Sequence, residues 1–165
     1  MSKSVKKKSS RSVPPPVLDD SRVIAYAIIE RPVKYSGRSN LLINGKEVGR
    51  VPRLVIARSF REKQFLLLHC SRSWAVLGSM GGFRSGSEAK RRAERIYPGI
   101  SAAWNTSAVT AREARTYRNA MWKGQECSFC GRLPYEIQSM VQGRNAKICD
   151  ICVHACYGLL SESSD

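Results

Sequence analysis

Short apolar, β-branched runs alternate with polar turns along the chain up to Gly82. The runs RVIAYAIIE, LVIARS, KQFLLLHC and SWAVLG predict four strands. Asn44-Gly45 lies between two short apolar segments, and Asn-Gly is the dipeptide that a two-residue hairpin turn prefers. Gly78 and the pair Gly81-Gly82 predict a loop after the last of these strands. The pattern predicts a small antiparallel sheet that begins near residue 21.

The spacing of apolar residues then changes from that of strands to that of helices. Ser85 or Ser87 is expected to cap a helix in SEAKRRAERIY, which ends at Pro98-Gly99. In this helix Ala89, Ala93 and Ile96 form one apolar stripe. Thr110 is expected to open a second helix, TAREARTYRNAMW, whose arginines lie apart from its apolar positions.

These elements predict an α+β fold with four parts. A basic tail rich in serine and proline, residues 1–20, lacks the apolar residues to bury a core and is expected to be disordered. Residues 21–105 are expected to form the small antiparallel α+β domain. Residues 106–124 are expected to form a connecting helix, and residues 125–161 a separate cysteine-rich module.

The charge of the chain raises the expectation of an anionic partner. It carries 28 Lys and Arg against 13 Asp and Glu, a formal net charge of +15. A nucleic acid would be bound by the Lys-rich tail and by arginines of the two helices, namely Arg91, Arg92, Arg112, Arg115 and Arg118. No apolar run approaches the length that crosses a bilayer, and no secretory signal is evident, so a cytoplasmic protein without a membrane partner is expected.

The first domain offers no catalytic constellation. It lacks a paired-carboxylate motif, a Ser-His-Asp set and a phosphate-binding loop, so a non-enzymatic protein is expected. His69 ends an apolar strand and is expected to be a core residue with its hydrogen bonds satisfied. Cys70 is expected to be a small buried hydrophobe.

Five of the six cysteines lie between Cys127 and Cys156. Cys127 and Cys130 form one C-x2-C pair and Cys149 and Cys152 another, with eighteen residues between the pairs, which is the spacing of a structural zinc site. A redox pair would leave two of the four cysteines unexplained, whereas an iron–sulfur cluster uses the same number of cysteines and stays open. Four thiolates would close a zinc site to substrate, so one structural Zn²⁺ per chain is expected. A module this small is expected to unfold without its metal.

The same stretch resembles a known family. C-S-F-C-G at 127–131, the run EIQSMV at 136–141, Gly143 and I-C-D-x-C-V-x-x-C at 148–156 are similar to the zinc-binding domain of the bacterial unfoldase ClpX. The resemblance implies a treble-clef-like fold, with a zinc knuckle, a β-hairpin and a helix that carries the second cysteine pair. It implies Cys127, Cys130, Cys149 and Cys152 as ligands and Cys156 as a non-ligand.

The resemblance also implies a module that dimerises and docks adaptor or substrate proteins. No nucleotide-binding loop accompanies it here, so no ATPase activity is expected. The module holds more apolar residues than so small a core encloses, and an uncovered apolar patch marks an interface. The residues expected to meet a protein partner, either a second copy or an adaptor, are Ile137, Met140, Ile151 and Leu160.

Overall fold

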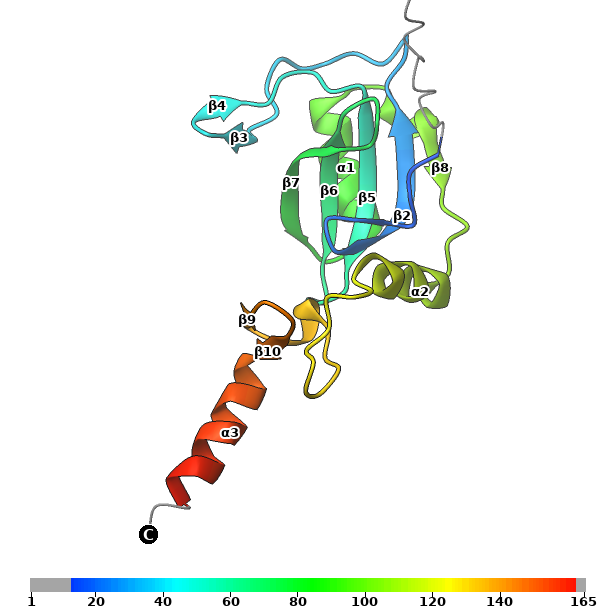
Figure 1. Ribbon diagram of the computed structural model, residues 1–165. Coiled ribbons are helices and arrows are strands. Elements are labelled where there is room, and N and C mark those ends of the chain that lie inside the picture. Colours follow the sequence, from blue (N-terminus) through cyan, green and yellow to red (C-terminus); the bar gives the residue numbers. More distant parts are fainter. Residues whose placement is uncertain (1–12, 163–165) are drawn as a thin grey trace, which may run out of the picture. The chain divides into compact units, whose positions relative to one another are not determined.

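The computed structural model describes residues 13–162 and confirms a mixed α+β protein (Figure 1). The chain forms two compact units, which divide in sequence between Ala114 and Arg115. The predicted connecting helix is present as α2 (Ala111–Met121), and the division falls within it. Thr110 caps α2 as predicted, because its hydroxyl accepts the Glu113 N–H at 3.2 Å and the Glu113 carboxylate accepts the Thr110 N–H at 2.8 Å.

The first unit is built on a six-stranded antiparallel sheet. The strands hydrogen-bond in the order β1-β2-β5-β6-β7. β8 also pairs with β2, at Ala25 to Ala27, whereas β1 pairs with Ser21 and Arg22 of the same strand. The sheet contains β1 (Val17–Leu18), β2 (Ser21–Ile28), β5 (Arg53–Ser59), β6 (Phe65–Cys70), β7 (Val76–Phe83) and β8 (Trp104–Thr106). The four strands expected from the apolar runs are therefore present, and β1 and β8 are additional.

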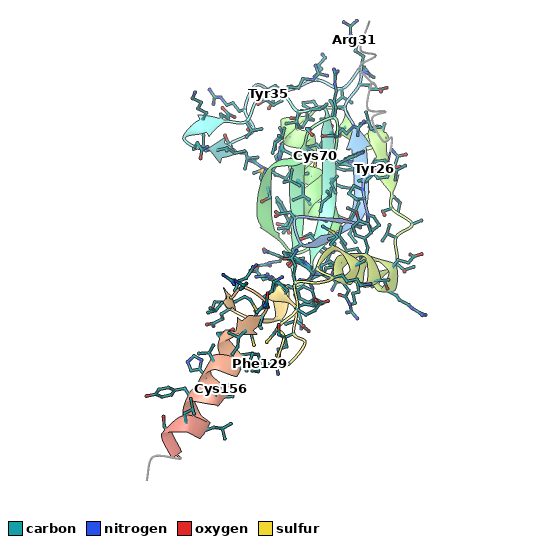
Figure 2. All side chains as sticks on the ribbon, viewed as in Figure 1. Tyr26, Arg31, Tyr35, Cys70, Phe129 and Cys156 are labelled. Atoms are coloured by element: carbon teal, nitrogen blue, oxygen red, sulfur yellow. The ribbon has the colours of Figure 1, made fainter. Side chains whose placement is uncertain are left out.

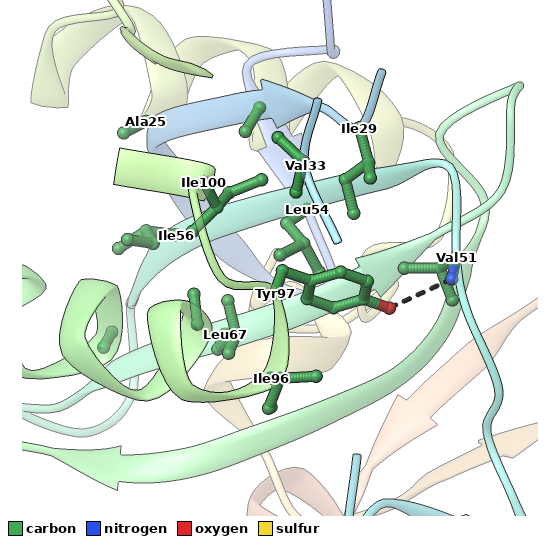
Figure 3. Packing of buried hydrophobic residues seen from close by; sticks show 13 residues of the cluster. Ala25, Ile29, Val33, Val51, Leu54, Ile56, Leu67, Ile96, Tyr97 and Ile100 are labelled. Atoms are coloured by element: carbon green, nitrogen blue, oxygen red, sulfur yellow. Dashed lines mark hydrogen bonds between the residues drawn. The ribbon is translucent and has the colours of Figure 1, made fainter. Parts of the chain in front are cut away.

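Helix α1 (Gly86–Ile96) packs against one face of this sheet (Figure 1). Ser85 is the N-cap, since its hydroxyl accepts the Glu88 N–H at 3.1 Å. The predicted stripe of Ala89, Ala93 and Ile96 is buried against Leu54, Ile56 and Leu67 of the sheet, and the short helix η1 (Ile100–Ala103) adds Ile100. Figure 3 shows this core, with the Val51 N–H donating to the Tyr97 hydroxyl oxygen at 3.0 Å.

The opposite face of the sheet holds a second apolar cluster, so β5 and β6 are buried on both faces. Val55, Leu68 and Cys70 lie here with Trp74, whose ring meets Tyr26 edge to face at 5.6 Å between centroids. Cys70 is buried, as expected, and burial raises the pKa of its thiol to about 12.

The Asn-Gly hairpin is confirmed. β3 (Leu42–Ile43) and β4 (Lys46–Glu47) pair around Asn44 (φ 50°) and Gly45 (φ 75°). Positive φ at both central positions is the type I′ geometry that matches the twist of a hairpin.

Two predictions about this unit are wrong. Residues 13–20 belong to the fold, because Val17 is buried and pairs with Arg22, while residues 1–12 of the predicted tail lie outside the described residues. The glycines at 78, 81 and 82 lie within β7 and not in a loop. A Cβ at Gly78 would lie 2.7 Å from Leu41 Cδ2, so this glycine allows the segment before β3 to pack closely on the strand.

The second unit continues from α2 into a small cysteine-rich module. Its elements are η2 (Pro134–Glu136), β9 (Met140–Gln142), β10 (Lys147–Cys149) and α3 (Asp150–Glu162). β9 and β10 form an antiparallel hairpin that leads directly into α3. This is the predicted order of knuckle, hairpin and helix. Among the described residues, no helix is long and apolar enough to cross a membrane.

Candidate metal centre

The first cysteine pair lies on a tight turn at the start of the module. The Gly131 N–H donates to the Cys127 carbonyl at 2.9 Å, and the Cys127 N–H donates to the Arg132 carbonyl at 2.8 Å. Gly131 has φ of 72°, a left-handed conformation that costs a residue with a Cβ about 1–2 kcal/mol. The glycine after Cys130 therefore allows the turn that brings Cys127 and Cys130 to the same side.

The second pair is placed by the hairpin and the helix. Cys149 ends β10 opposite Met140, and Cys152 lies in the first turn of α3. The Cys149 N–H donates to Cys127 Sγ and the Cys152 N–H to Cys149 Sγ, both at 3.4 Å. Backbone amides thus point at the sulfurs from both pairs, which stabilises negative charge on them.

The four sulfur atoms have the geometry of a single-ion site. Sγ of Cys127 lies 3.8 Å from Sγ of Cys152, Sγ of Cys130 lies 3.6 Å from Sγ of Cys149, and all four lie within 4.8 Å of one another. Zn–S bonds of about 2.3 Å in a tetrahedron place sulfurs about 3.8 Å apart. An iron–sulfur cluster holds several iron atoms between its cysteines and needs them farther apart, so the spacing fits one Zn²⁺.

The protonation of the thiols also fits a metal site. Burial raises the pKa of Cys127, but hydrogen bonds from the backbone amides of Cys130, Cys149 and Phe129 outweigh it and lower the pKa to about 6. The Arg132 amide lowers the pKa of Cys130. The pKa of Cys152 is raised, mainly by its neighbour Cys130 and then by burial. Four sulfurs this close cannot all ionise without a cation, and Zn²⁺ supplies that charge.

The end of α2 and the turn that follows it contact the rest of the module. The Arg118 guanidinium lies over the Tyr135 ring at 3.5 Å from its centroid, and the Tyr135 hydroxyl donates to Asn119 Oδ1 at 2.7 Å. The Lys147 ammonium donates to the Gly124 carbonyl at 2.8 Å. The residues of α2 after Ala114 therefore pack as part of the module.

This packing gives a structural role to Arg118, one of the residues predicted to contact nucleic acid. Arg118 is only 8% exposed and covers an aromatic ring, so its position is structural. Arg91, Arg112 and Arg115 are exposed and Arg92 is half-buried. Arg92 lies close enough to His69 to lower the pKa of that histidine, although burial lowers it more.

The comparison with known families agrees with this geometry. Residues 125–162 match the family model of the ClpX C4-type zinc finger. The segment is a ClpX-type zinc finger. The match covers this finger only, and residues 1–124 are unassigned. No solved structure matches the chain.

Two side chains near the zinc finger stand outside the ligand set. Cys156 lies one turn of α3 after Cys152 and does not belong to the cluster of four sulfurs. His154 is exposed, and its Nδ1 lies 2.8 Å from the Asp150 carbonyl oxygen, within the same helix. The finger therefore has the closed four-cysteine donor set of a structural zinc site.

The residues predicted to meet a partner lie on two different surfaces. Ile151 and Leu160 are nine residues apart on α3, which is two and a half turns, so they point to opposite sides of the helix. Ile151 lines a shallow hollow together with Ile137 and Tyr135, and Met140 is half-buried in the hairpin. Leu160 shares its side of α3 with Val153 and Tyr157, because a helix with about 3.6 residues per turn brings these three positions into one stripe.

Proposed function

We propose that the ClpX-type zinc finger is a non-catalytic protein-docking module that joins two copies of this chain through α3. The observation that carries the proposal is the exposed apolar surface of this helix. Val153 is 40% exposed, and Tyr157 and Leu160 are each 72% exposed. They follow one another at intervals of four and three residues, the spacing with which helices pack side by side. We call Val153, Tyr157 and Leu160 the α3 stripe.

Most of α3 is exposed and little of it packs inside the finger. The helix contacts the rest of its unit mainly through β10, where Cys149 and Cys152 bring it to the zinc site (Figures 1 and 2). Among residues 13–162, seven of the twelve exposed large hydrophobic side chains belong to the finger, namely Phe129, Val141, Ile151, Val153, Tyr157, Leu159 and Leu160. Such a concentration in so short a segment marks an interface.

The charge of α3 favours a second copy as the partner. Between Asp150 and Glu162 the helix carries no Asp, Glu, Lys or Arg. Two copies of the α3 stripe would therefore pack without like-charge repulsion, which is the requirement for a two-fold interface. Dimerisation is also what the family resemblance implies, with adaptor proteins as the alternative partners.

Native mass spectrometry of the full chain tests the proposal. We expect a dimer with two zinc ions at micromolar concentration, and monomers after chelation, because α3 is attached to the finger through two zinc ligands. Leu160→Asp places a charge in the α3 stripe and is expected to give a zinc-bound monomer. Leu159→Asp makes the same change at an exposed leucine one residue away, on the side of α3 that faces away from Val153 and Tyr157, and is expected to remain a dimer.

The result that contradicts self-association is a zinc-bound monomer of the unchanged protein under these conditions. A dimer that both substitutions leave intact would place the interface elsewhere. The zinc content recorded in the same spectra distinguishes a lost interface from a lost fold, because the variants are expected to retain one zinc ion per chain.

A further inference from the structure

The first unit distributes its charge unevenly between the two ends of the sheet. At one end β2 and β6 finish and β5 and β7 begin, and the connecting segments are residues 29–53 and 70–75. These segments hold two acidic residues, Glu30 and Glu47, and seven basic ones, Arg31, Lys34, Arg38, Lys46, Arg50, Arg53 and Arg72. We call this the basic end; Arg31 and Tyr35 mark it in Figure 2.

The other end of the sheet is nearly balanced. Residues 19–22, 58–65 and 83–88 hold five basic and four acidic residues. The ion pair between Arg61 and Asp20, at 3.1 Å, lies here. Of the two ends of the sheet, the basic end therefore carries most of the net positive charge.

The acidic residues at the basic end leave much of this charge uncompensated. The Glu47 carboxylate accepts hydrogen bonds from the backbone amides of Ser39 and Asn40 and from the Ser39 hydroxyl, so it fixes the β3–β4 hairpin to the segment before it. Within residues 13–162, no ion pair links Glu30 or Glu47 to an arginine or lysine. An anion from outside the chain would supply the missing charge.

An open hollow lies at the centre of the basic end. Ile29, Val51 and Pro52 form its apolar part, and Arg50 and Arg72 supply its charge. Its volume is ≈ 330 Å³, and no carboxylate of the described residues lines it. Both arginines are exposed. Arg50 Nη2 donates to the Val33 carbonyl at a long 3.4 Å, which leaves most of its donors available, and Arg72 makes no hydrogen bond to any described residue.

Neighbouring buried groups respond to the two arginines. Burial raises the pKa of Tyr97, and the charge of Arg50 is one of the influences that oppose this rise. Burial lowers the pKa of Arg53, and Arg72 lowers it further by repulsion. Arg53 itself lies over the Trp74 ring at 4.4 Å and is buried, so its charge adds to the positive potential of the basic end without lining the hollow.

From this arrangement we propose that the hollow between Arg50 and Arg72 binds a backbone phosphate of a nucleic acid that lies along the basic end. A guanidinium donates two parallel N–H groups to phosphate oxygens, which makes arginine well suited to this anion. Arg31, Lys34, Arg38 and Lys46 in the same connecting segment are exposed and would meet further phosphates of the same strand. Contacts of this kind position a nucleic acid without reading its bases.

A concave site favours a phosphate on a polymer over a lipid surface. A phosphodiester backbone carries its charges on projecting groups that enter a hollow, whereas a bilayer presents a broad, nearly flat surface of headgroups. The site lies in the first unit and is independent of the docking role proposed for the zinc finger. The site also differs from the Lys-rich tail and the two helices from which the sequence predicted nucleic-acid binding.

The test is the salt dependence of binding by the full-length, zinc-loaded chain. Fluorescence anisotropy with a labelled DNA duplex of about 20 base pairs gives the affinity at several NaCl concentrations between about 50 and 200 mM. Because Arg50 and Arg72 hold one phosphate between them, the double variant Arg50→Gln/Arg72→Gln is expected to lower the slope of log affinity against log salt by about 0.9. The control Lys63→Gln/Arg84→Gln removes the same charge from two exposed positions at the other end of the sheet, and its slope is expected to stay unchanged.

Three outcomes would overturn the assignment. Equal losses in both double variants would mean that binding follows net charge and not the hollow. Failure of the unchanged protein to bind the duplex at the lowest salt would show that a nucleic acid is not the ligand. Binding to phosphatidylcholine vesicles that contain phosphatidylserine, without binding to the duplex, would assign the basic end to membrane lipid. Circular dichroism of each variant verifies that its fold is retained.

Discussion

Replacing His69 by leucine is expected to make the first unit less sensitive to acid. His69 lies in β6 with none of its surface exposed, 6.4 Å from the Tyr97 ring between centroids. Neither of its ring nitrogens has a hydrogen-bond partner among the described residues. Its core position was expected from the sequence, but its hydrogen bonds are not satisfied.

The size of the effect follows from the pKa of this side chain. Burial, and then the charge of Arg92, lower the pKa of His69 from 6.5 to about 4. The unfolded chain therefore binds a proton that the folded chain refuses between these values, so stability is full above pH 6.5 and falls as the pH drops towards 4. A shift of this size corresponds to about 3.4 kcal/mol in total, of which about 2 kcal/mol is lost between about pH 7.5 and pH 5.

Urea denaturation followed by tryptophan fluorescence measures this loss. In a Trp122→Phe background the remaining tryptophans, Trp74 and Trp104, both lie in the first unit and report on it alone. The protein with His69 is expected to lose about 2 kcal/mol more than His69→Leu over this pH range. His154→Asn, which changes the exposed histidine of α3, is expected to behave as the unchanged protein. If the free energy of unfolding falls equally with pH in the protein with His69 and in His69→Leu, the reasoning is refuted.

Three further predictions concern the metal centre and the core. Removal of zinc by a strong chelator is expected to unfold the finger, and an unchanged far-ultraviolet circular dichroism spectrum would contradict this. Gly131→Ala forces a Cβ into a left-handed turn and is expected to weaken zinc binding about tenfold in a competition titration. Gly143→Ala, at a glycine without positive φ, is expected to keep the affinity. Tyr97→Phe removes the acceptor of the buried Val51 N–H and is expected to cost about 1–3 kcal/mol in urea denaturation, whereas no loss would mean that the amide finds another partner.

The elements that could be predicted are those whose signals are local. Asn44-Gly45 determines its hairpin, because these two residues adopt positive φ at little cost. Ser85 and Thr110 mark helix starts, since their hydroxyls accept amides three residues later. The two C-x2-C pairs identified the metal centre, because four thiolates in one short segment have few other uses.

The errors arose where distant segments meet. Gly78 looked like a loop residue, but the segment before β3 packs on it and keeps it in a strand. Arg118 looked like a surface charge until Tyr135, seventeen residues later, was found beneath its guanidinium.

The sequence by itself determined the two-part α+β organisation, the hairpin, the helix starts and the four cysteines of the zinc finger. In each case a residue's own backbone preference or a short spacing is sufficient to decide the structure. Only the tertiary structure decided which side chains share a surface. Arg50 and Arg72 face one hollow because β5 and β6 are antiparallel neighbours, and Val153, Tyr157 and Leu160 remain exposed because the finger is too small to cover them. Such groupings depend on pairing and packing between segments, which no local pattern encodes.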